Sequence, residues 1–349
     1  MKNAIKTVLG AAASLCALGF AGFAGSALAA DKMRIGIVNA SSDVVYFIAE
    51  KKGYFAAENI EPEFITFISA TQMIAPLGVG DLDVGGGGPS AGLYNAAERK
   101  VNVKVVADKG SMPSGYGYFS MLVRKDLVTS GKVKTVADFK GLKVGDTSKQ
   151  GSGDVTLAAF LKQGGLKFED VDTLYMGAPQ LAVALQNGAM DAALIQEPSL
   201  SLAVSQGSAV LFAKGDEIYP NQQLAVTFFS EKLATTNRAL AQRFMNAYVR
   251  AARFYNDALK DGRLAGPNAA EVIDLLVEKT NLKDRAIYAN IVPNGLNPDG
   301  CANAEGLRED FRFYAGMGWA DGKADPDSLV DATFCKAAVA KLGPYVKAK

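Results

Sequence analysis

The sequence predicts an α/β protein with two lobes, and two observations support that prediction. Short apolar runs alternate with segments of helical periodicity that start at cap-type residues, an order typical of parallel sheets with right-handed crossovers. This alternation runs from residue 33 to about residue 107 and starts again near residue 135. A chain of 349 residues is also long for one ordinary core, whereas it suits two.

The first unit is expected to contain four strands with helices between them. Cap-type segments such as Ser41-Ser42-Asp43 and Ser69-Ala70-Thr71 mark where two of the helices begin. The expected strands are 33–38, 60–67, 83–86 and 101–107, and the expected helices are 44–52, 72–79 and a segment that ends at residue 99.

The second unit repeats the same order over about 122–222. A short helix at 135–140 leads into it. Its expected strands are 143–145, 171–176, 191–195 and 209–213, and its expected helices are 155–163, 179–187 and 198–205.

Two extended segments, 118–123 and 224–229, are expected to join the units. The tail is expected to be helical and to complete the first lobe. Its expected helices are 237–260, 269–280, 303–317 and 327–342. We therefore assign residues 30–120 and 225–349 to lobe one and residues 121–224 to lobe two.

The first 29 residues have the pattern of a secretory signal peptide. Lys2 and Lys6 give a positive start, an apolar run follows at 8–23, and Ala27-Leu28-Ala29 is a small-x-small cleavage site. The apolar run is short for a membrane span, and the alternative is a retained N-terminal anchor. Cleavage after Ala29 or Ala30 would deliver the mature chain to the periplasm.

Charge and composition exclude several classes of function. The chain has 37 Lys and Arg against 36 Asp and Glu, so no strong field attracts nucleic acid or a membrane surface. It has no histidine, which removes the commonest general base and most zinc sites. We expect a binding protein without a metal or another cofactor, and not an enzyme.

Cys301 and Cys335 would remain after the signal peptide is removed. An even pair of cysteines in an oxidising compartment predicts a disulfide bond, and two separately buried thiols are the alternative. A catalytic cysteine is not expected, because no histidine is present to activate it.

Four segments, taken in order, resemble those of a known family. FIAEKKGYF at 47–55, LGVGDLDVG at 77–85, KTVADFKGLKV at 134–144 and NGAMDA at 187–192 are similar to segments of periplasmic binding proteins for nitrate, sulfonate, taurine and thiamine precursors. Glu197-Pro198 stands where those relatives carry an acidic residue and proline. The resemblance covers about residues 33–260.

The resemblance implies a fold and a partner. Family members are extracytoplasmic receptors of ABC importers with a type II fold, in which two α/β lobes joined by two crossover strands hold a solute in the cleft between them. It therefore implies a membrane permease as the protein partner, and we expect a monomer. An enzyme resembling the related pyrimidine-precursor synthases, a receptor for another transport or sensor system, and an exported structural or adhesive protein are the alternatives.

Ligands of open α/β sheets bind beyond the carboxyl ends of the strands, so candidate contacts follow each strand. In lobe one they are Ser42, Asp43, Tyr46, Thr71, Gln72, Gly88 and Ser90. For Ser42, Thr71 and Ser90 the alternative is helix N-capping, which stabilises by about 1 kcal/mol each. The glycines at 85–88 have the alternative role of permitting close packing.

The candidates in lobe two are Lys149, Gln150, Gly151, Ser152, Gln180, Gln196 and Glu197. The segment 147–153 is polar and glycine-rich ahead of a helix, and we expect it to cradle an anionic group. Glu197 has the alternative role of compensating a helix dipole. Tyr116, near the first connector, either stacks on the ligand or packs beside a hinge.

The charges in these loops limit the ligand. They offer one cation, Lys149, and two carboxylates, Asp43 and Glu197. A buried dianion would need arginine or dense N–H donation. This set of charges favours a zwitterion such as a taurine-like amine–sulfonate, or a neutral nitrogen heterocycle.

Overall fold

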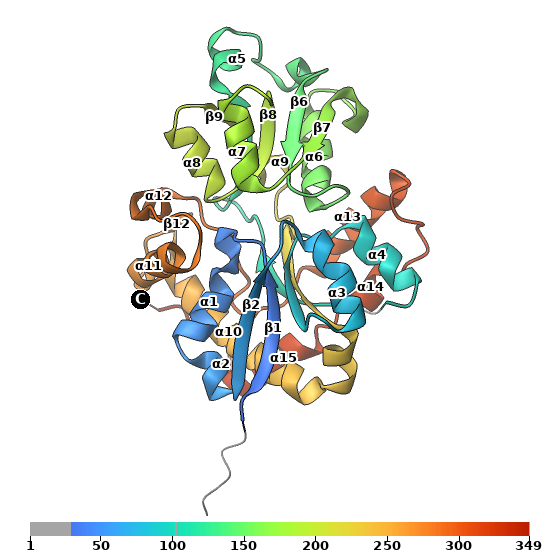
Figure 1. The fold of residues 1–349 in the computed structure, drawn as a ribbon, viewed down its shortest axis with the longest axis vertical. Coiled ribbons are helices and arrows are strands. Elements are labelled where there is room, and N and C mark those ends of the chain that lie inside the picture. The colour runs from blue at the N-terminus through green and yellow to red at the C-terminus, as the bar shows by residue number, and fades with distance from the viewer. Residues whose placement is uncertain (1–28, 102, 349) are drawn as a thin grey trace, which may run out of the picture.

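Two β-sheets lie one above the other along the long axis of the molecule (Figure 1). The computed structural model describes residues 29–101 and 103–348, so the expected signal segment, except for its last residue, lies outside the described residues. The lower sheet has the strand order β2-β1-β3-β10-β4. Its strands are β1 (Asp31–Ile37), β2 (Ile60–Thr66), β3 (Val84–Gly87), β4 (Lys104–Gly110) and β10 (Ala225–Phe229).

The upper sheet has the order β7-β6-β8-β5-β9. Its strands are β5 (Phe119–Arg124), β6 (Lys143–Asp146), β7 (Asp172–Tyr175), β8 (Ala192–Gln196) and β9 (Ala209–Ala213). In each sheet one strand runs antiparallel to both of its neighbours. That strand is β10 in the lower sheet and β5 in the upper sheet.

The two segments expected as connectors are these two antiparallel strands. Every residue of β10 is buried, as are the first five residues of β5. Such continuous apolar burial is typical of a strand covered on both faces. The chain therefore crosses between the sheets at 111–118 and 214–224, and not at the expected positions.

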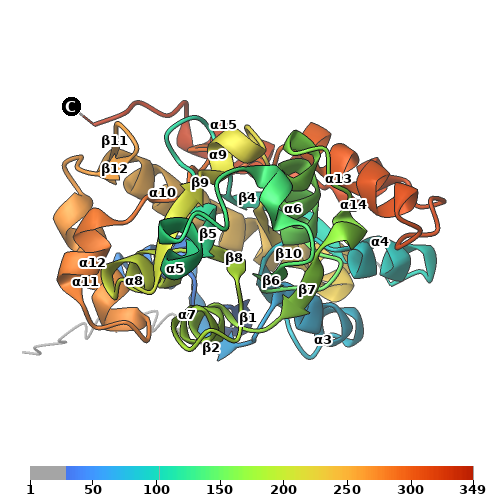
Figure 2. The ribbon, with the colours of Figure 1, turned by 90° about the horizontal axis from the view of Figure 1, so that it is seen from above.

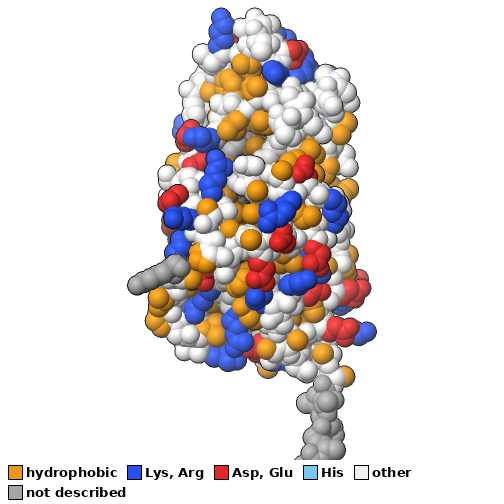
Figure 3. Space-filling view, turned by 90° about the vertical axis from the view of Figure 1, so that its left-hand side faces the viewer, with side chains coloured by type: hydrophobic (Ala, Val, Ile, Leu, Met, Phe, Trp, Pro, Cys, Tyr) orange, Lys and Arg blue, Asp and Glu red, His pale blue; other side chains and the backbone are white. Residues whose placement is uncertain are grey.

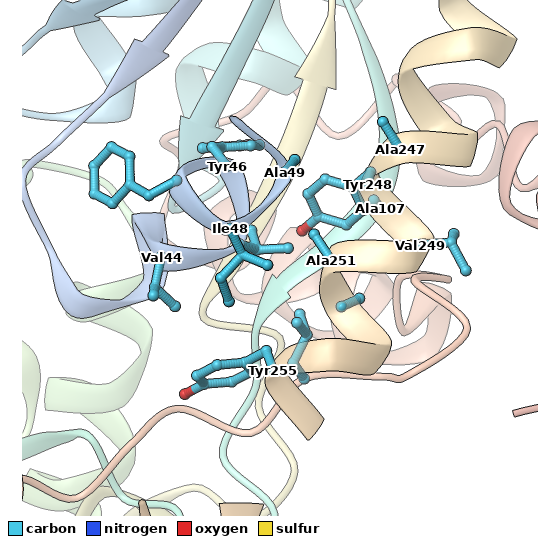
Figure 4. Close-up of a cluster of buried hydrophobic side chains, with 14 of the residues drawn as sticks. Val44, Tyr46, Ile48, Ala49, Ala107, Ala247, Tyr248, Val249, Ala251 and Tyr255 are labelled. Atoms are coloured by element: carbon cyan, nitrogen blue, oxygen red, sulfur yellow. The ribbon is translucent and has the colours of Figure 1, made fainter. Parts of the chain in front are cut away.

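One group of helices in lobe one packs around the long helix α10 (Arg238–Ala258). Six consecutive residues in its middle, 244–249, are buried, so this part of the helix is covered on all sides. One side of it meets α1 (Val44–Lys51), and the rings of Tyr46 and Tyr248 lie 5.8 Å apart at their centroids (Figure 4). The remaining helices of this part are α2 (Tyr54–Ala57), α3 (Ile74–Val79) and α4 (Ala91–Glu98).

Lobe two surrounds its sheet with short helices. They are α5 (Lys125–Thr129), α6 (Ser152–Gln163), α7 (Ala178–Gln186), α8 (Ser199–Ser205) and α9 (Gly215–Ile218). The helix expected at 135–140 is a 3-10 turn, Val136–Phe139, which opens with a capping box between Thr135 and Asp138. Gly141, at φ +77°, turns the chain into β6 soon after it.

The tail reaches both lobes. Its elements are the hairpin β11 (Leu259–Lys260) and β12 (Arg263–Leu264), and the helices α11 (Ala269–Lys279), α12 (Arg285–Asn290), α13 (Ala304–Gly316), α14 (Pro326–Leu329) and α15 (Thr333–Leu342). Seen from above, α11 and α12 flank one side of the molecule and α13 and α14 the other (Figure 2). Because α12 contacts α8 and α13 contacts α6, the tail does more than complete lobe one.

One tail helix was predicted wrongly. The segment 327–342 is broken between α14 and α15, because Val330 forms a parallel bridge to Val105 and the amide of Asp331 donates to the Val105 carbonyl. The backbone there is used to extend the edge of the lower sheet. The expected disulfide bond between Cys301 and Cys335 is confirmed, and it ties α15 to the loop ahead of α13.

The surface agrees with the near-neutral net charge. On the face drawn in Figure 3, basic and acidic side chains are interspersed without a large patch of one sign. None of the helices in the described part of the chain is long and apolar enough to cross a membrane.

Candidate ligand-binding site

A cavity of about 70 Å³ lies between the two lobes. The residues of its wall come from both lobes and from the two crossing segments, 111–118 and 214–224. One buried water needs roughly 10–15 Å³ by the same measure, so the cavity suits a small solute. The residues that line it are Val38, Ala40, Ser42, Ile68, Ser69, Ala70, Gly87, Gly88, Pro89, Lys109, Tyr118, Phe119, Thr147, Ser148, Ser152, Gly153, Gln196, Leu224 and Ala225.

Lys109, near the end of β4, is one of the residues of this wall, and its ammonium group is buried. Its Nζ lies 2.9 Å from Oδ1 of Asp43 and donates a 2.9 Å hydrogen bond to Oγ of Ser42. Both charged side chains are 0% exposed. The other oxygen of Asp43 accepts the amides of Val38 and Ala40, at 3.2 and 3.0 Å. The carboxylate of Asp43 is thus committed to protein partners, while Lys109 lines the cavity.

Glycines in and just after β3 make room for this arrangement. A Cβ on Gly86 would lie 2.6 Å from the Tyr46 hydroxyl and 2.7 Å from Cε of Lys109. A Cβ on Gly88 would lie 2.5 Å from Oγ of Ser152, which belongs to the other lobe. The glycine run therefore permits close packing, and Gly88 also lines the cavity.

Three buried hydroxyls near the site have no hydrogen-bond partner among the described residues, and they belong to Ser41, Ser90 and Tyr118. Leaving a buried hydroxyl unpaired costs roughly 1–3 kcal/mol. Tyr118 lines the cavity and is 2% exposed, and its hydroxyl is one of these three. N-capping by side chain is not observed at Ser90 or at Ser42.

Several contacts hold the lobes together around the cavity. The amide of Ala91 donates to the Gln150 carbonyl at 2.9 Å, and the amide of Ser152 donates to the Pro89 carbonyl at 3.0 Å. The hydroxyls of Thr71 and Ser148 are 2.8 Å apart. The loops that precede α4 and α6 are thus paired with each other, and the structure is a closed form.

Four of the residues expected from the sequence line the cavity. They are Ser42, Gly88, Ser152 and Gln196. The other predicted residues are not part of the cavity wall. These are Asp43, Tyr46, Thr71, Gln72, Ser90, Tyr116, Lys149, Gln150, Gly151, Gln180 and Glu197.

Tyr46 and Tyr116 serve packing in this structure. The Tyr46 side chain is fully buried, and its hydroxyl lies 2.8 Å from that of Thr227. Burial is the main cause that raises the pKa of Tyr46. Tyr116 packs against the core of lobe one.

The cation of the cavity is Lys109, whereas Lys149 is exposed and does not line it. Lys109 follows the strand expected at 101–107, but it was not among the predicted contacts. In the structure β4 runs from Lys104 to Gly110, three residues later than expected. The position of Lys109 at the carboxyl end of a strand could have identified it, because the other predicted contacts also lie at the carboxyl ends of strands.

Glu197 connects the lobes from a buried position. Its carboxylate accepts the amide and hydroxyl of Ser201, at 3.0 and 2.8 Å, and the amide of Val292 from the tail, at 3.3 Å. Its backbone carbonyl accepts the amide of Ser41 at 3.2 Å. Burial raises the pKa of Glu197 to about 7.

A second buried acid pair, Asp146 and Asp154, lies beneath the start of α6. Asp154 accepts the amide of Gln150 at 2.6 Å and the hydroxyl of Tyr175 at 3.1 Å. Burial is the largest cause that raises the pKa of Asp154, to about 6, and that of Asp146 well above its usual range. Two adjacent buried carboxyls resist ionising together, so the pair shares a proton. The bond from the Gln150 amide to Asp154 holds the 147–153 loop against this pair.

Comparisons with known proteins agree with this architecture. The model of the NMT1-like family matches residues 26–269. A protein of Escherichia coli K12 that is named for binding aliphatic sulfonates is 28% identical over 255 residues, which is 72% of this chain and 74% of that protein.

Solved structures share the fold. The periplasmic nitrate-binding protein of Synechocystis PCC 6803 superposes with a TM-score of 0.75 at 15% identity, covering 90% of this chain and 89% of that one. A desulfurization enzyme superposes with a TM-score of 0.60 at 16% identity, covering 89% and 99%. The fold alone thus hosts both binding and catalysis. By its sequence and its fold, this chain belongs to the NMT1-like family and has the two-lobed architecture of periplasmic binding proteins.

Proposed function

We propose that this protein is the extracytoplasmic solute-binding receptor of an ABC importer and that it captures a small organic monoanion of the sulfonate type. The observation that carries the proposal is the buried ammonium of Lys109 in the wall of a cavity between two lobes. The name of the Escherichia coli relative, which refers to aliphatic sulfonates, supports an anionic ligand.

The charges of the wall favour an anion over the zwitterion or heterocycle that the loops suggested. None of the described residues that line the cavity carries a carboxylate, so a ligand amine would lack a charged partner there. Because Asp43 already balances Lys109, the pair carries no net positive charge, which disfavours a dianion. The hydroxyls of Ser42 and Tyr118 supplement the ammonium as polar contacts.

The rest of the wall supports an organic anion. Val38, Ile68, Phe119 and Leu224 offer apolar surface next to the polar groups. Ligand sites typically combine such apolar walls with a few convergent polar groups. A solute in this cavity contacts both lobes, so it favours the closed state by its differential affinity for that state. The closed receptor then docks on the permease.

Calorimetric titration of the mature chain with methanesulfonate, taurine, nitrate and sulfate tests the proposal. We expect methanesulfonate to bind more tightly than sulfate. The double variant Asp43→Asn/Lys109→Met removes the buried charges together, so it avoids leaving one of them unpaired. It should weaken methanesulfonate binding by about tenfold or more, since hydrogen bonds to charged groups contribute about 1.5–3 kcal/mol.

Lys149→Met is the matched control, because this lysine lies in the loop next to the site but is exposed. It should leave the affinity within about twofold. Equal binding by the double variant and the wild type, or binding of none of the organic anions, would overturn the proposal.

A further inference from the structure

The loop between α12 and α13, residues 291–303, lies along the strand that carries Lys109. We call it the tail loop. Strand β4 is the last strand in the order of the lower sheet, so its outer edge has no neighbouring strand of that sheet. An uncovered edge would leave backbone donors and acceptors unpaired. The tail loop covers the carboxyl end of this edge, next to the candidate site.

Backbone hydrogen bonds join the tail loop to β4 on both sides of Lys109. On one side, the amide of Asp108 donates to the Gly300 carbonyl at 2.9 Å. On the other side, Ser111 and Gly295 form an antiparallel bridge, and each amide donates to the other residue's carbonyl at 2.9 Å. The loop therefore fixes the backbone just before and just after the lysine.

Asn294 holds the backbone of the lysine itself. Its side-chain amide donates to the Lys109 carbonyl at 3.2 Å, and its side-chain oxygen accepts the hydroxyl of Tyr255, from α10, at 3.0 Å. Asn294 is 1% exposed, so water does not compete for these bonds. Asp43 and Ser42 contact the ammonium group, whereas Asn294 fixes the point from which the lysine side chain starts.

The carboxyl of Asp108 fastens the tail loop at a second place. It accepts the backbone amide of Asn297 and the side-chain amide of Gln223, each at 2.7 Å. The side-chain oxygen of Gln223 in turn accepts the backbone amide of Asn303 at 2.7 Å. Since Gln223 belongs to the second crossing segment, the loop joins β4 to the chain that passes between the lobes.

The disulfide bond anchors the tail loop to the core of lobe one. Cys301 follows Gly300, which accepts from β4, and precedes Asn303, which donates to Gln223. Its partner Cys335, in α15, is fully buried and belongs to the same hydrophobic cluster as the buried face of α10. The crosslink therefore restricts movement of the loop away from β4.

We infer that the tail loop positions Lys109 for the anion, with Asn294 as the positioning residue and the Cys301–Cys335 bond as the anchor of the loop. None of the described residues that line the cavity belongs to the tail loop, so the loop acts through the lysine. A site gains affinity when its charged group is held in place before the ligand arrives. This inference rests on the proposed function.

Calorimetric titration with methanesulfonate tests the inference in two variants. Asn294→Ala removes the bond to the Lys109 carbonyl, and Cys301→Ser/Cys335→Ser releases the loop from α15. Each should weaken methanesulfonate binding by about fivefold or more, because the ammonium group is then no longer held in place before binding.

Asn246→Ala is the matched control. Asn246 is also a buried asparagine of lobe one, 3% exposed, but its side-chain amide donates to Glu58 at 3.3 Å. Its replacement should lower stability as Asn294→Ala does, and it should leave the affinity within about twofold of the wild type.

Amide hydrogen exchange adds a readout that needs no ligand. In Cys301→Ser/Cys335→Ser the amides of Asp108 and Ser111 should exchange faster than in the wild type, while those of β10 keep their protection. Unchanged exchange at Asp108 and Ser111 would overturn the anchoring role of the disulfide, whether or not a sulfonate binds.

The titrations separate this inference from the proposed function. Wild-type affinity in both Asn294→Ala and the cysteine variant would overturn the inference and leave the proposed function intact. Equal weakening by Asn246→Ala would assign the effect to a general loosening of lobe one and would also overturn it. Should Asn294→Ala fail to fold, the affinity of the cysteine variant decides. Absence of methanesulfonate binding by the wild type would overturn the proposed function and, with it, this inference.

Discussion

Each lobe buries an aspartate near the cleft, but the partners of these aspartates differ. In lobe one Asp43 faces the ammonium of Lys109 at 2.9 Å, and both side chains are fully buried. In lobe two Asp146 faces a second acid, Asp154. The first pair is a buried ion pair, and its lysine is one of the residues that line the cavity. The second pair lies beside the 147–153 loop, so among the described residues that line the cavity the charged side chain, Lys109, comes from lobe one.

The largest expected effect comes from breaking the pair in lobe one. Lys109→Met leaves Asp43 as a buried charge without its partner, which should lower the free energy of unfolding by about 3–5 kcal/mol. Urea denaturation at neutral pH measures the loss, and Asp43→Asn/Lys109→Met should recover most of it. Lys149→Met, an exposed change, should stay within about 0.5 kcal/mol of the wild type. Wild-type stability of Lys109→Met would mean that the pair is not buried as described.

A smaller effect of the opposite sign is expected in lobe two. Asp146→Asn replaces the shared proton by an amide, so it should raise the free energy of unfolding at pH 8 by about 1–2 kcal/mol. Burial raises the folded-state pKa of both acids above the unfolded value, so their stabilising contribution is complete below about pH 4. That contribution is lost as the pH rises through about 6 and above.

Urea denaturation from pH 5 to pH 8 measures this dependence. Stability of the wild type should fall over the interval, and the slope should be shallower in Asp146→Asn. Asp172→Asn, at an exposed position in the neighbouring strand, is the control and should keep the wild-type slope. A steeper slope in Asp146→Asn would contradict the shared proton.

The smallest effect concerns the contact of Glu197 with the tail. Separation of the lobes would expose this carboxyl and remove its bond from Val292, so the closed state binds the proton more tightly than an open state. Closure is then favoured below pH 7, and ligand affinity should fall by up to about tenfold as the pH rises from 6 to 8. In Glu197→Gln the affinity should be nearly constant over this range.

Trp319, the single tryptophan, provides an independent readout. Its ring lies 5.2 Å from that of Phe168, which belongs to the other lobe. Its fluorescence should therefore respond to closure, and the response to ligand should weaken with rising pH in the wild type only. A pH dependence that persists in Glu197→Gln would assign the effect to another group.

The order of strands and helices was predictable because it depends on local patterns. Cap-type residues, glycines and apolar periodicity lie within a few positions of each boundary they mark. The exceptions depend on distant partners. Strand β4 continues through Asp108 and Lys109 because Gln223 and Asp43 satisfy their charges. The tail helix breaks at Val330 because that residue pairs with the edge of the lower sheet.

The site was predictable to the same extent. Ser42, Gly88, Ser152 and Gln196 were predicted because the carboxyl ends of strands converge on the cleft, and they line the candidate cavity. Lys109 was not found because its burial depends on Asp43, which lies far from it in the sequence. Local polarity also does not show whether a loop lysine points at the cavity or at solvent.

A crystal structure of the mature chain with a bound alkanesulfonate tests the central claim most directly. We predict that a sulfonate oxygen lies within about 3.2 Å of Nζ of Lys109, between the lobes. A sulfonate held at the Lys149 loop, or anywhere without contact to Lys109, would contradict the account.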